Sequence, residues 1–102
     1  MANEQVVYID IDLEDLIPEF MENRKNDVIA VKELLAQGNL NEIKRIGHSM
    51  KGSGGGYGFD RITEIGKMME DAANEGDVAV IVEANENLNE YLSAVKIVWQ
   101  EE

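Results

Sequence analysis

Helical spacing of apolar residues runs through almost the whole chain and limits the folds open to it more than any other feature. From residue 13 onward, apolar residues recur three or four positions apart, and glycine interrupts the pattern at Gly38 and Gly76. Apolar residues at this spacing form one face of an amphipathic helix, and glycine is common just beyond a helix end. The sequence therefore predicts helices joined by short connections.

Four helices are expected, over residues 12–37, 40–57, 61–75 and 78–100. Asp12, followed by Asp15, has the pattern of a carboxylate N-cap for the first helix, and Asn39, followed by Glu42, has that pattern for the second. Pro18 is compatible with a first helical turn or with a break between two shorter helices. Helices of this length predict an all-α fold, an antiparallel four-helix bundle that forms a single domain over residues 1–102.

The first eleven residues precede the predicted helices and contain the apolar stretch VVYI at positions 6–9. A stretch of this length is too short for an independent strand system. We expect residues 1–11 to form a short N-terminal arm that packs in an extended form or joins the first helix.

Composition excludes several classes of protein. The chain has 102 residues, no cysteine and a net charge of −12. Without cysteine there is no disulfide, thiolate metal site or cysteine nucleophile. The sequence has no apolar run of about eighteen residues and no secretory signal at its start, so we expect a cytosolic protein without a membrane span. Strong negative charge disfavours nucleic acid and acidic membranes, and nothing indicates a dimer, so we expect a monomer.

The chain has a single histidine, which stands directly before a glycine cluster in the segment HSMKGSGGGYGF at 48–59. On a helix with about 100° per residue, the apolar Ile46 and Met50 lie on the face opposite His48. Gly52 lies within about 40° of the histidine, and Lys51 lies about 60° from it. The histidine is therefore expected on the solvent face of the helix.

The glycine that follows one turn after the histidine carries a cost. Gly52 inside a helix is less favourable than alanine by roughly 0.8 to 1 kcal/mol, which indicates a compensating role. A missing side chain at this position would leave the ring of His48 open to a partner protein. The alternative is that GSGGG is a flexible loop or a frayed helix end.

Positive charges gather near the histidine although the chain is acidic. Segment 44–67 holds only two carboxylates, Asp60 and Glu64, against the cations Lys44, Arg45, Lys51, Arg61 and Lys67. Lysine is a compact point charge that suits phosphate oxygens, and Lys51 lies on the same side of the helix as His48. The sequence predicts a basic patch on an acidic body, with an ordinary solvated face as the alternative.

The histidine and its lysine suit phosphoryl transfer. Neutral imidazole is a nitrogen nucleophile that forms covalent intermediates, and phosphoryl transfer depends mainly on positioning and charge stabilisation. The sequence has no G-x-x-x-x-G-K-[ST] loop, and no nucleotide pocket or metal cluster is recognisable in it. The residues therefore indicate a phosphoryl carrier without autonomous enzyme activity.

The histidine segment resembles the histidine-containing phosphotransfer (HPt) domain family of two-component phosphorelays. The family pattern of histidine, leucine or methionine, lysine, glycine, serine or threonine and a later glycine is met by His48, Met50, Lys51, Gly52, Ser53 and Gly58. The likeness extends over nearly the whole chain, with an acid-rich opening helix, helix ends at Gly38 and Gly76, and Glu70 in the third helix. The run Gly54–Gly56 departs from relatives, which usually carry larger residues there.

The resemblance implies that His48 accepts a phosphoryl group from the aspartyl phosphate of a receiver domain, or from a histidine kinase, and passes it to the receiver of a response regulator. It further implies that Lys51 stabilises the phosphoryl group and that Gly52 clears the docking surface. Further docking or electrostatic positions are expected at Lys44, Arg45, Gly55 and Lys67. No metal or cofactor is expected on this chain, because magnesium would belong to the acidic pocket of the receiver.

Two alternatives do not need a reactive histidine nucleophile. One is an interaction module that binds an acidic partner through the basic patch and an apolar rim such as Phe59 with Ile62. Replacing His48 with glutamine would leave that function intact. The other is a metal site formed by His48 and carboxylates, which the surrounding cations disfavour.

Overall fold

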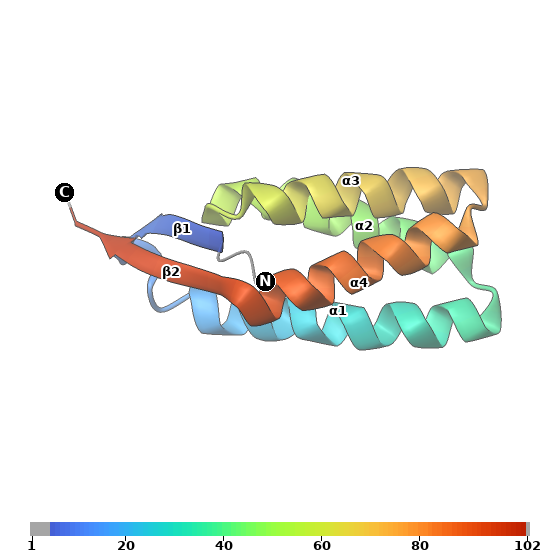
Figure 1. Ribbon diagram of the computed structural model, residues 1–102, viewed down its shortest axis with the longest axis horizontal. Helices are drawn as coiled ribbons and strands as arrows, with labels where there is room; N and C mark the ends of the chain where they lie inside the picture. Colours follow the sequence, from blue (N-terminus) through green and yellow to red (C-terminus); the bar gives the residue numbers. More distant parts are fainter. Residues whose placement is uncertain (1–4, 102) are drawn as a thin grey trace.

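The computed structural model describes residues 5–101, which form four α-helices, two short strands and two 3-10 turns (Figure 1). In chain order the elements are β1 (Gln5–Asp10), η1 (Ile11–Leu13), α1 (Ile17–Gln37), α2 (Leu40–Ser53), η2 (Gly55–Tyr57), α3 (Asp60–Glu75), α4 (Val78–Ala94) and β2 (Val95–Gln100). The helices run alternately up and down the long axis, which confirms the predicted antiparallel four-helix bundle. Within residues 5–101, no helix is long and apolar enough to cross a membrane.

The apolar stripes of the four helices meet in one core. Ile43 and Met50 from α2, Ile65 and Met69 from α3, and Leu88 from α4 are all completely buried. The contact between α2 and α3 is the most extensive between any two helices, and α1 contacts its neighbours less. The α2–α3 pair is therefore the densest part of the bundle.

Two glycines allow α2 and α3 to pack this closely. A Cβ atom at Gly47 would lie 2.7 Å from the backbone nitrogen of Glu70, and one at Gly66 would lie 2.5 Å from the backbone nitrogen of Lys51. Side-chain carbons do not approach backbone atoms at such distances, so both positions need glycine. The close approach brings the turn of α2 that carries His48 against the turn of α3 that carries Glu70.

The predicted helix boundaries around residues 38 and 76 are confirmed. The side chain of Asn39 accepts a hydrogen bond from the backbone N–H of Glu42 at 3.3 Å and caps α2. Gly38 and Gly76 end α1 and α3 with φ of 71° and 74°, in the left-handed region that favours glycine. Gly38 and Asn39 thus set where α1 ends and α2 begins, and Gly76 sets where α3 ends.

The predicted start of the first helix at residue 12 is wrong. Asp12 lies in η1, where its backbone N–H donates to the carboxylate of Asp10 at 2.9 Å, and α1 begins at Ile17 without a side-chain cap. Pro18 lies in the first turn of α1, where its missing N–H removes no helical hydrogen bond. The proline thus marks a helix start and does not separate two helices.

The predicted extension of the fourth helix to residue 100 is also wrong, because α4 ends at Ala94 and β2 follows it. The segment VKIVWQ alternates part-buried and exposed residues and is rich in β-branched side chains, which favour strands. It pairs in parallel with β1, with Tyr8 opposite Val98. The expected N-terminal arm is therefore a strand at one end of the bundle, while residues 1–4 of that arm and residue 102 lie outside the described part of the chain.

Candidate functional site

The only histidine lies on the outer face of α2, where its side chain is 70% exposed. Its Nδ1 atom lies 2.7 Å from Oε2 of Glu70, which reaches it from α3. A carboxylate accepts hydrogen bonds, so this contact favours the tautomer in which Nδ1 of His48 carries the proton. In that tautomer the lone pair is on Nε2.

Glu70 also binds the lysine of the site. Oε1 of Glu70 lies 2.6 Å from Nζ of Lys51, and the glutamate side chain is only 15% exposed. The hydrogen bond from Lys51 lowers the pKa of Glu70 below its ordinary value, burial opposes this effect, and the bond from His48 adds to it. The ionised carboxylate therefore holds both side chains of α2 in fixed positions.

The surface next to the histidine is open at the predicted glycine. Apart from its own stretch of helix backbone, a Cβ atom built at Gly52 would meet no atom of residues 5–101 within 4 Å. Packing therefore does not require glycine at this position. By contrast, a Cβ atom at Gly54 would lie 2.7 Å from the backbone nitrogen of Thr63, so the second glycine is required by close packing against α3.

The glycine run ends α2 at Ser53, and the predicted helix to residue 57 is wrong. The backbone N–H of Gly55 donates to Oγ1 of Thr63 at 2.7 Å, and that hydroxyl donates to the carbonyl of Lys51 at 3.2 Å. Gly58 then turns the chain with φ of 92°. Through these two hydrogen bonds, Thr63 fixes the end of α2 next to the backbone of Lys51.

The predicted basic patch is interleaved with acidic and amide side chains. Among the cations named from the sequence, the contacts are Lys44 with Asn74 at 2.9 Å, Arg45 with Glu42 at 3.7 Å, Arg61 with Glu64 at 3.2 Å, and Lys67 with Asp71 at 3.0 Å. Glu42 and Asp71 lie outside segment 44–67, so a count along that segment omits them. Of the predicted cations, only Lys51 shares a partner with His48.

The role of Glu70, and of the glycines that bring it into place, does not follow from the local sequence pattern. Glu70 entered only as part of a family likeness. The available signal was the spacing of small residues, since Gly47 directly precedes His48 and Gly66 lies one turn before Glu70. Small residues on two facing helices indicate where the backbones approach each other.

The apolar rim of the interaction-module hypothesis is not at the surface. Phe59 and Ile62 are completely buried. The ring of Phe59 stacks on Phe20 with centroids 5.3 Å apart and meets the edge of Tyr91 at 6.5 Å. These residues belong to the core, and the rim predicted from them is wrong.

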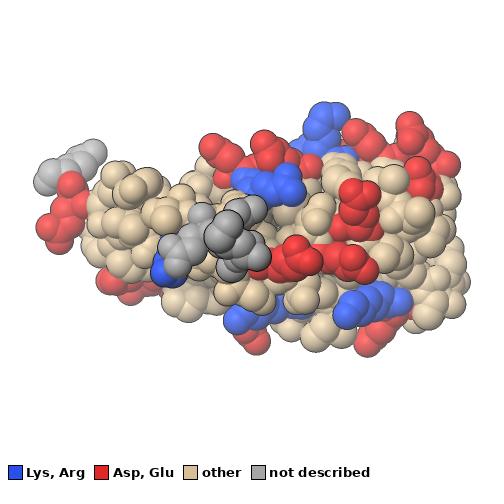
Figure 2. All heavy atoms as spheres, in the orientation of Figure 1, with Lys and Arg blue, Asp and Glu red and all other residues tan. Residues whose placement is uncertain are grey.

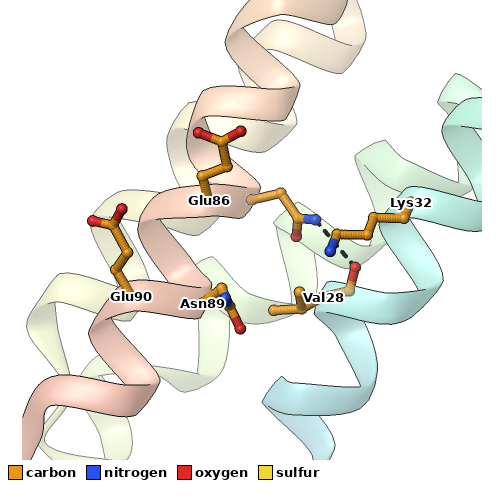
Figure 3. A pocket seen from close by; sticks show the side chains of 6 residues that line it. Val28, Lys32, Glu86, Asn89 and Glu90 are labelled. Atoms are coloured by element: carbon orange, nitrogen blue, oxygen red, sulfur yellow. Dashed lines mark hydrogen bonds between the residues drawn. The ribbon is translucent and has the colours of Figure 1, made fainter.

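A separate pocket of about 130 Å³ lies between α1 and α4, lined by Val28, Lys32, Asn85, Glu86, Asn89 and Glu90 (Figure 3). The side-chain amide of Asn85 donates to the carbonyl of Val28 at 3.1 Å, while its Oδ1 is buried without a partner in residues 5–101. The carboxylates of Glu86 and Glu90 point away from Val28. The residues that line this pocket include none of those that hold His48.

Four antiparallel helices that present one exposed histidine, held by a carboxylate beside a lysine, define a class of helical phosphocarrier domains. Residues 13–97 match the family described as Hpt domain, and the chain belongs to that family. Hpt domains are phosphocarriers of two-component phosphorelays, where they interact with receiver domains and histidine kinases. Comparisons with curated proteins and with solved structures give no match.

Proposed function

We propose that this protein carries a phosphoryl group on Nε2 of His48. The donor is the aspartyl phosphate of a receiver domain or a histidine kinase, and the acceptor is the receiver domain of a response regulator. The observation that carries the proposal is the 2.7 Å contact between Nδ1 of His48 and Glu70, which directs the lone pair to Nε2 on an exposed face. The membership of residues 13–97 in the Hpt family supports it.

In the proposed transfer, the Nε2 lone pair attacks the phosphorus atom as the bond from phosphorus to the aspartate oxygen breaks. The aspartate leaves as a carboxylate, and the proton on Nδ1 stays on the ring, where it is bonded to Glu70. Attack through a lone pair needs no separate base, because no proton leaves the nucleophile. Transfer onward to a second receiver is the same step with the roles of the two groups reversed.

Lys51 supplies positive charge to the phosphoryl oxygens in this proposal. Its ammonium group has three donors, so it can keep its bond to Glu70 and still donate to a phosphoryl oxygen. Its side chain is 37% exposed, which leaves it accessible from the surface that carries His48. Phosphoryl transfer gains most from such positioned charge.

Gly52 provides the clearance for a docking receiver, because no side chain of the described residues 5–101 lies within 4 Å of the place of a Cβ atom there. Arg45 and Lys67 have side chains that are 79% and 66% exposed, so both are positioned to contact a partner at the rim of the interface. Lys44 and Gly55 are weaker candidates, since the first donates to Asn74 and the second to Thr63. Magnesium for the reaction would come with the receiver, and the carrier would act as a monomer.

The test is phosphorylation by a panel of receiver domains loaded with a small phosphodonor. Wild-type protein should acquire acid-labile, base-stable phosphate and should pass it to a second receiver. The His48→Gln variant should acquire none, while Ser49→Ala serves as a neighbouring control that should label normally. Phosphate on the His48→Gln variant would refute the proposal, and so would the absence of label on folded wild-type protein across the panel.

A further inference from the structure

Lys51 is held by three residues that share one face of α3. Thr63, Gly66 and Glu70 lie three and four positions apart, which places them on one side of that helix. The hydroxyl of Thr63 donates to the backbone carbonyl of Lys51 at 3.2 Å, and Gly66 lies against the backbone nitrogen of the same residue. Glu70 binds the ammonium group at 2.6 Å. The lysine of the site is therefore fixed at both ends of its backbone and at the tip of its side chain.

Thr63 takes the place of a helical hydrogen bond at the end of α2. In a continuing α-helix, the N–H of Gly55 would donate to the carbonyl of Lys51, four residues earlier. The helix ends at Ser53 instead, and the N–H of Gly55 donates to Oγ1 of Thr63 at 2.7 Å, while that hydroxyl donates to the carbonyl of Lys51. One hydroxyl thus separates two groups that a continued helix would join. Without it, the carbonyl of Lys51 would lose its bond to α3.

The glycine run that departs from the family pattern makes room for this hydroxyl. A Cβ atom at Gly54 would lie 2.8 Å from Oγ1 of Thr63 and 2.7 Å from its backbone nitrogen. A Cβ atom at Gly55 would lie 3.5 Å from the same oxygen, which is an ordinary contact distance. A side chain at residue 54 would therefore displace the hydroxyl from Lys51, so the arrangement needs glycine at this position of the run.

The positive charge at the site depends on where single side chains are placed. The chain has a net charge of −12, and Figure 2 shows Asp and Glu side chains between those of Lys and Arg on the face that it draws. Near the site, Arg45 pairs with Glu42, and Lys67 pairs with Asp71. Neighbouring acids offset the field of these cations, so a cation contributes most where its side chain reaches the phosphoryl oxygens directly.

We propose that Thr63 is a positioning residue for phosphoryl transfer and acts through Lys51. The inference rests on the proposed function, in which Lys51 donates to the phosphoryl group on His48. The direction in which a side chain leaves a helix depends on the two peptide groups beside its Cα atom, and Thr63 fixes the second of these for Lys51. Within residues 5–101, the hydroxyl of Thr63 bonds to the backbone of Lys51 and Gly55 and to no side chain of the site. Its effect on transfer therefore passes through the lysine.

The main variant is Thr63→Val, which removes the hydroxyl and keeps the β-branched shape and a similar helix propensity. In rapid-quench kinetics with a phosphorylated receiver, the maximal transfer rate should fall by about fivefold. The receiver concentration that gives half of this rate should change little, because the open face beside His48 and Gly52 is kept. Thr63→Ala also lacks the hydroxyl and should behave in the same way. Thr63→Ser keeps the hydroxyl and should restore the rate to within about twofold of wild type.

A double-mutant cycle tests whether Thr63 acts through the lysine. Lys51→Met removes the charge and keeps a long unbranched side chain. In that background, Thr63→Val should slow transfer no further, because the group that it positions is absent. Val31→Ala is the control for stability, since it removes methyl groups from a completely buried position on α1. It should lower stability and leave the transfer rate unchanged.

NMR checks the geometry without any phosphoryl transfer. The carbon chemical shift of the Lys51 carbonyl and the amide shift of Gly55 should move in Thr63→Val and stay near wild type in Thr63→Ser. Both atoms bond to the hydroxyl of Thr63, so both shifts report its loss. An unchanged Lys51 carbonyl in Thr63→Val would overturn the inference, because the hydroxyl would then not hold that group.

The kinetic results separate this inference from the proposed function. If no receiver labels folded wild-type protein, the proposed function fails and the inference falls with it. If wild type transfers phosphate and Thr63→Val transfers it at the same rate, the inference alone is refuted. Equal slowing by Thr63→Val with and without the lysine would also refute it, as would a Val31→Ala variant that is slowed as much as Thr63→Val.

Discussion

The two sides of the bundle are packed by different means. On the α2–α3 side, the backbones approach so closely that Gly47 and Gly66 admit no side chain, and the carboxylate of Glu70 joins two residues of the facing helix. On the α1–α4 side, Asn85 leaves its Oδ1 atom buried without a partner in the described chain, next to a pocket of about 130 Å³. Every side chain that holds the histidine comes from the dense side.

The difference indicates what the site requires. His48 and Lys51 stand on α2 and Glu70 stands on α3, with contacts of 2.7 and 2.6 Å between them. Hydrogen bonds of this kind have donor–acceptor distances of about 2.7 to 3.2 Å, so a small separation of the two helices would release both side chains. Between α1 and α4, the hydrogen bond from the Asn85 amide to the carbonyl of Val28 at 3.1 Å holds no residue of the site, so the site does not depend on that spacing.

The largest effect is expected from Gly66→Ala, which adds a side chain where the helices are closest. Its Cβ atom would lie 2.5 Å from the backbone nitrogen of Lys51 and 2.7 Å from the carbonyl of Gly47. Backbone atoms in a packed helix cannot move aside without shifting the helix, so we expect a loss of about 3 kcal/mol in the free energy of unfolding. Urea denaturation measures it.

Gly52→Ala is the matched control, because it adds the same methyl group to open space on α2. It should raise the free energy of unfolding by roughly 0.8 to 1 kcal/mol through helix propensity alone. If the two alanine variants were equally stable, the close approach of α2 and α3 would not constrain the fold. The difference in packing between the α2–α3 side and the α1–α4 side would then be refuted.

Much of this dense side follows from local sequence signals. The cap at Asn39 and the stops at Gly38 and Gly76 depend on residues within one turn, so they were predictable and are confirmed. The solvent-facing position of His48 follows from helical periodicity for the same reason.

The errors fall where distant segments decide the structure. Val95, Val98 and Trp99 fit a helical stripe as well as a strand, and the outcome depends on pairing with β1 at the other end of the chain. The basic patch was overstated for two reasons. A count over segment 44–67 omits Glu42 and Asp71, which pair with Arg45 and Lys67 within one helical turn, and Glu70 reaches Lys51 only when α2 and α3 pack together. The role of Glu70 likewise depends on a contact between α2 and α3 that no single segment encodes.

A smaller effect is expected from Glu70→Gln, which keeps the shape of the side chain and removes its charge. An amide offers one oxygen acceptor, so it cannot accept from both Nδ1 of His48 and Nζ of Lys51 as the carboxylate does. Loss of one charge-assisted hydrogen bond should slow phosphoryl transfer from a receiver by about tenfold. Rapid-quench kinetics with one receiver measures the rate.

The pH dependence of stability checks the same ionised carboxylate. Because Lys51 lowers the pKa of Glu70 in the folded protein below 4.5, the contribution of this carboxylate to stability is present above pH 4.5 and is lost as pH falls through the lowered pKa. The difference in unfolding free energy between wild type and Glu70→Gln should therefore shrink below pH 4.5. A difference that stays constant down to pH 2.5 would show that Glu70 acts without its charge.

An effect as small as that of Gly52→Ala is expected from Asn85→Leu on the opposite side of the bundle. The substitution removes a buried Oδ1 that has no partner within residues 5–101 and adds apolar volume beside the pocket. The carbonyl of Val28, which accepts from Asn85, lies within α1 and can still accept its helical hydrogen bond. We expect an increase of about 1 kcal/mol in the free energy of unfolding.

The rate of phosphoryl transfer should not change, because α1 and α4 supply none of the contacts that hold His48. A loss of stability would mean that the bond from Asn85 to Val28 outweighs the unpaired oxygen, and a slower transfer would show that the looser side of the bundle also positions the histidine.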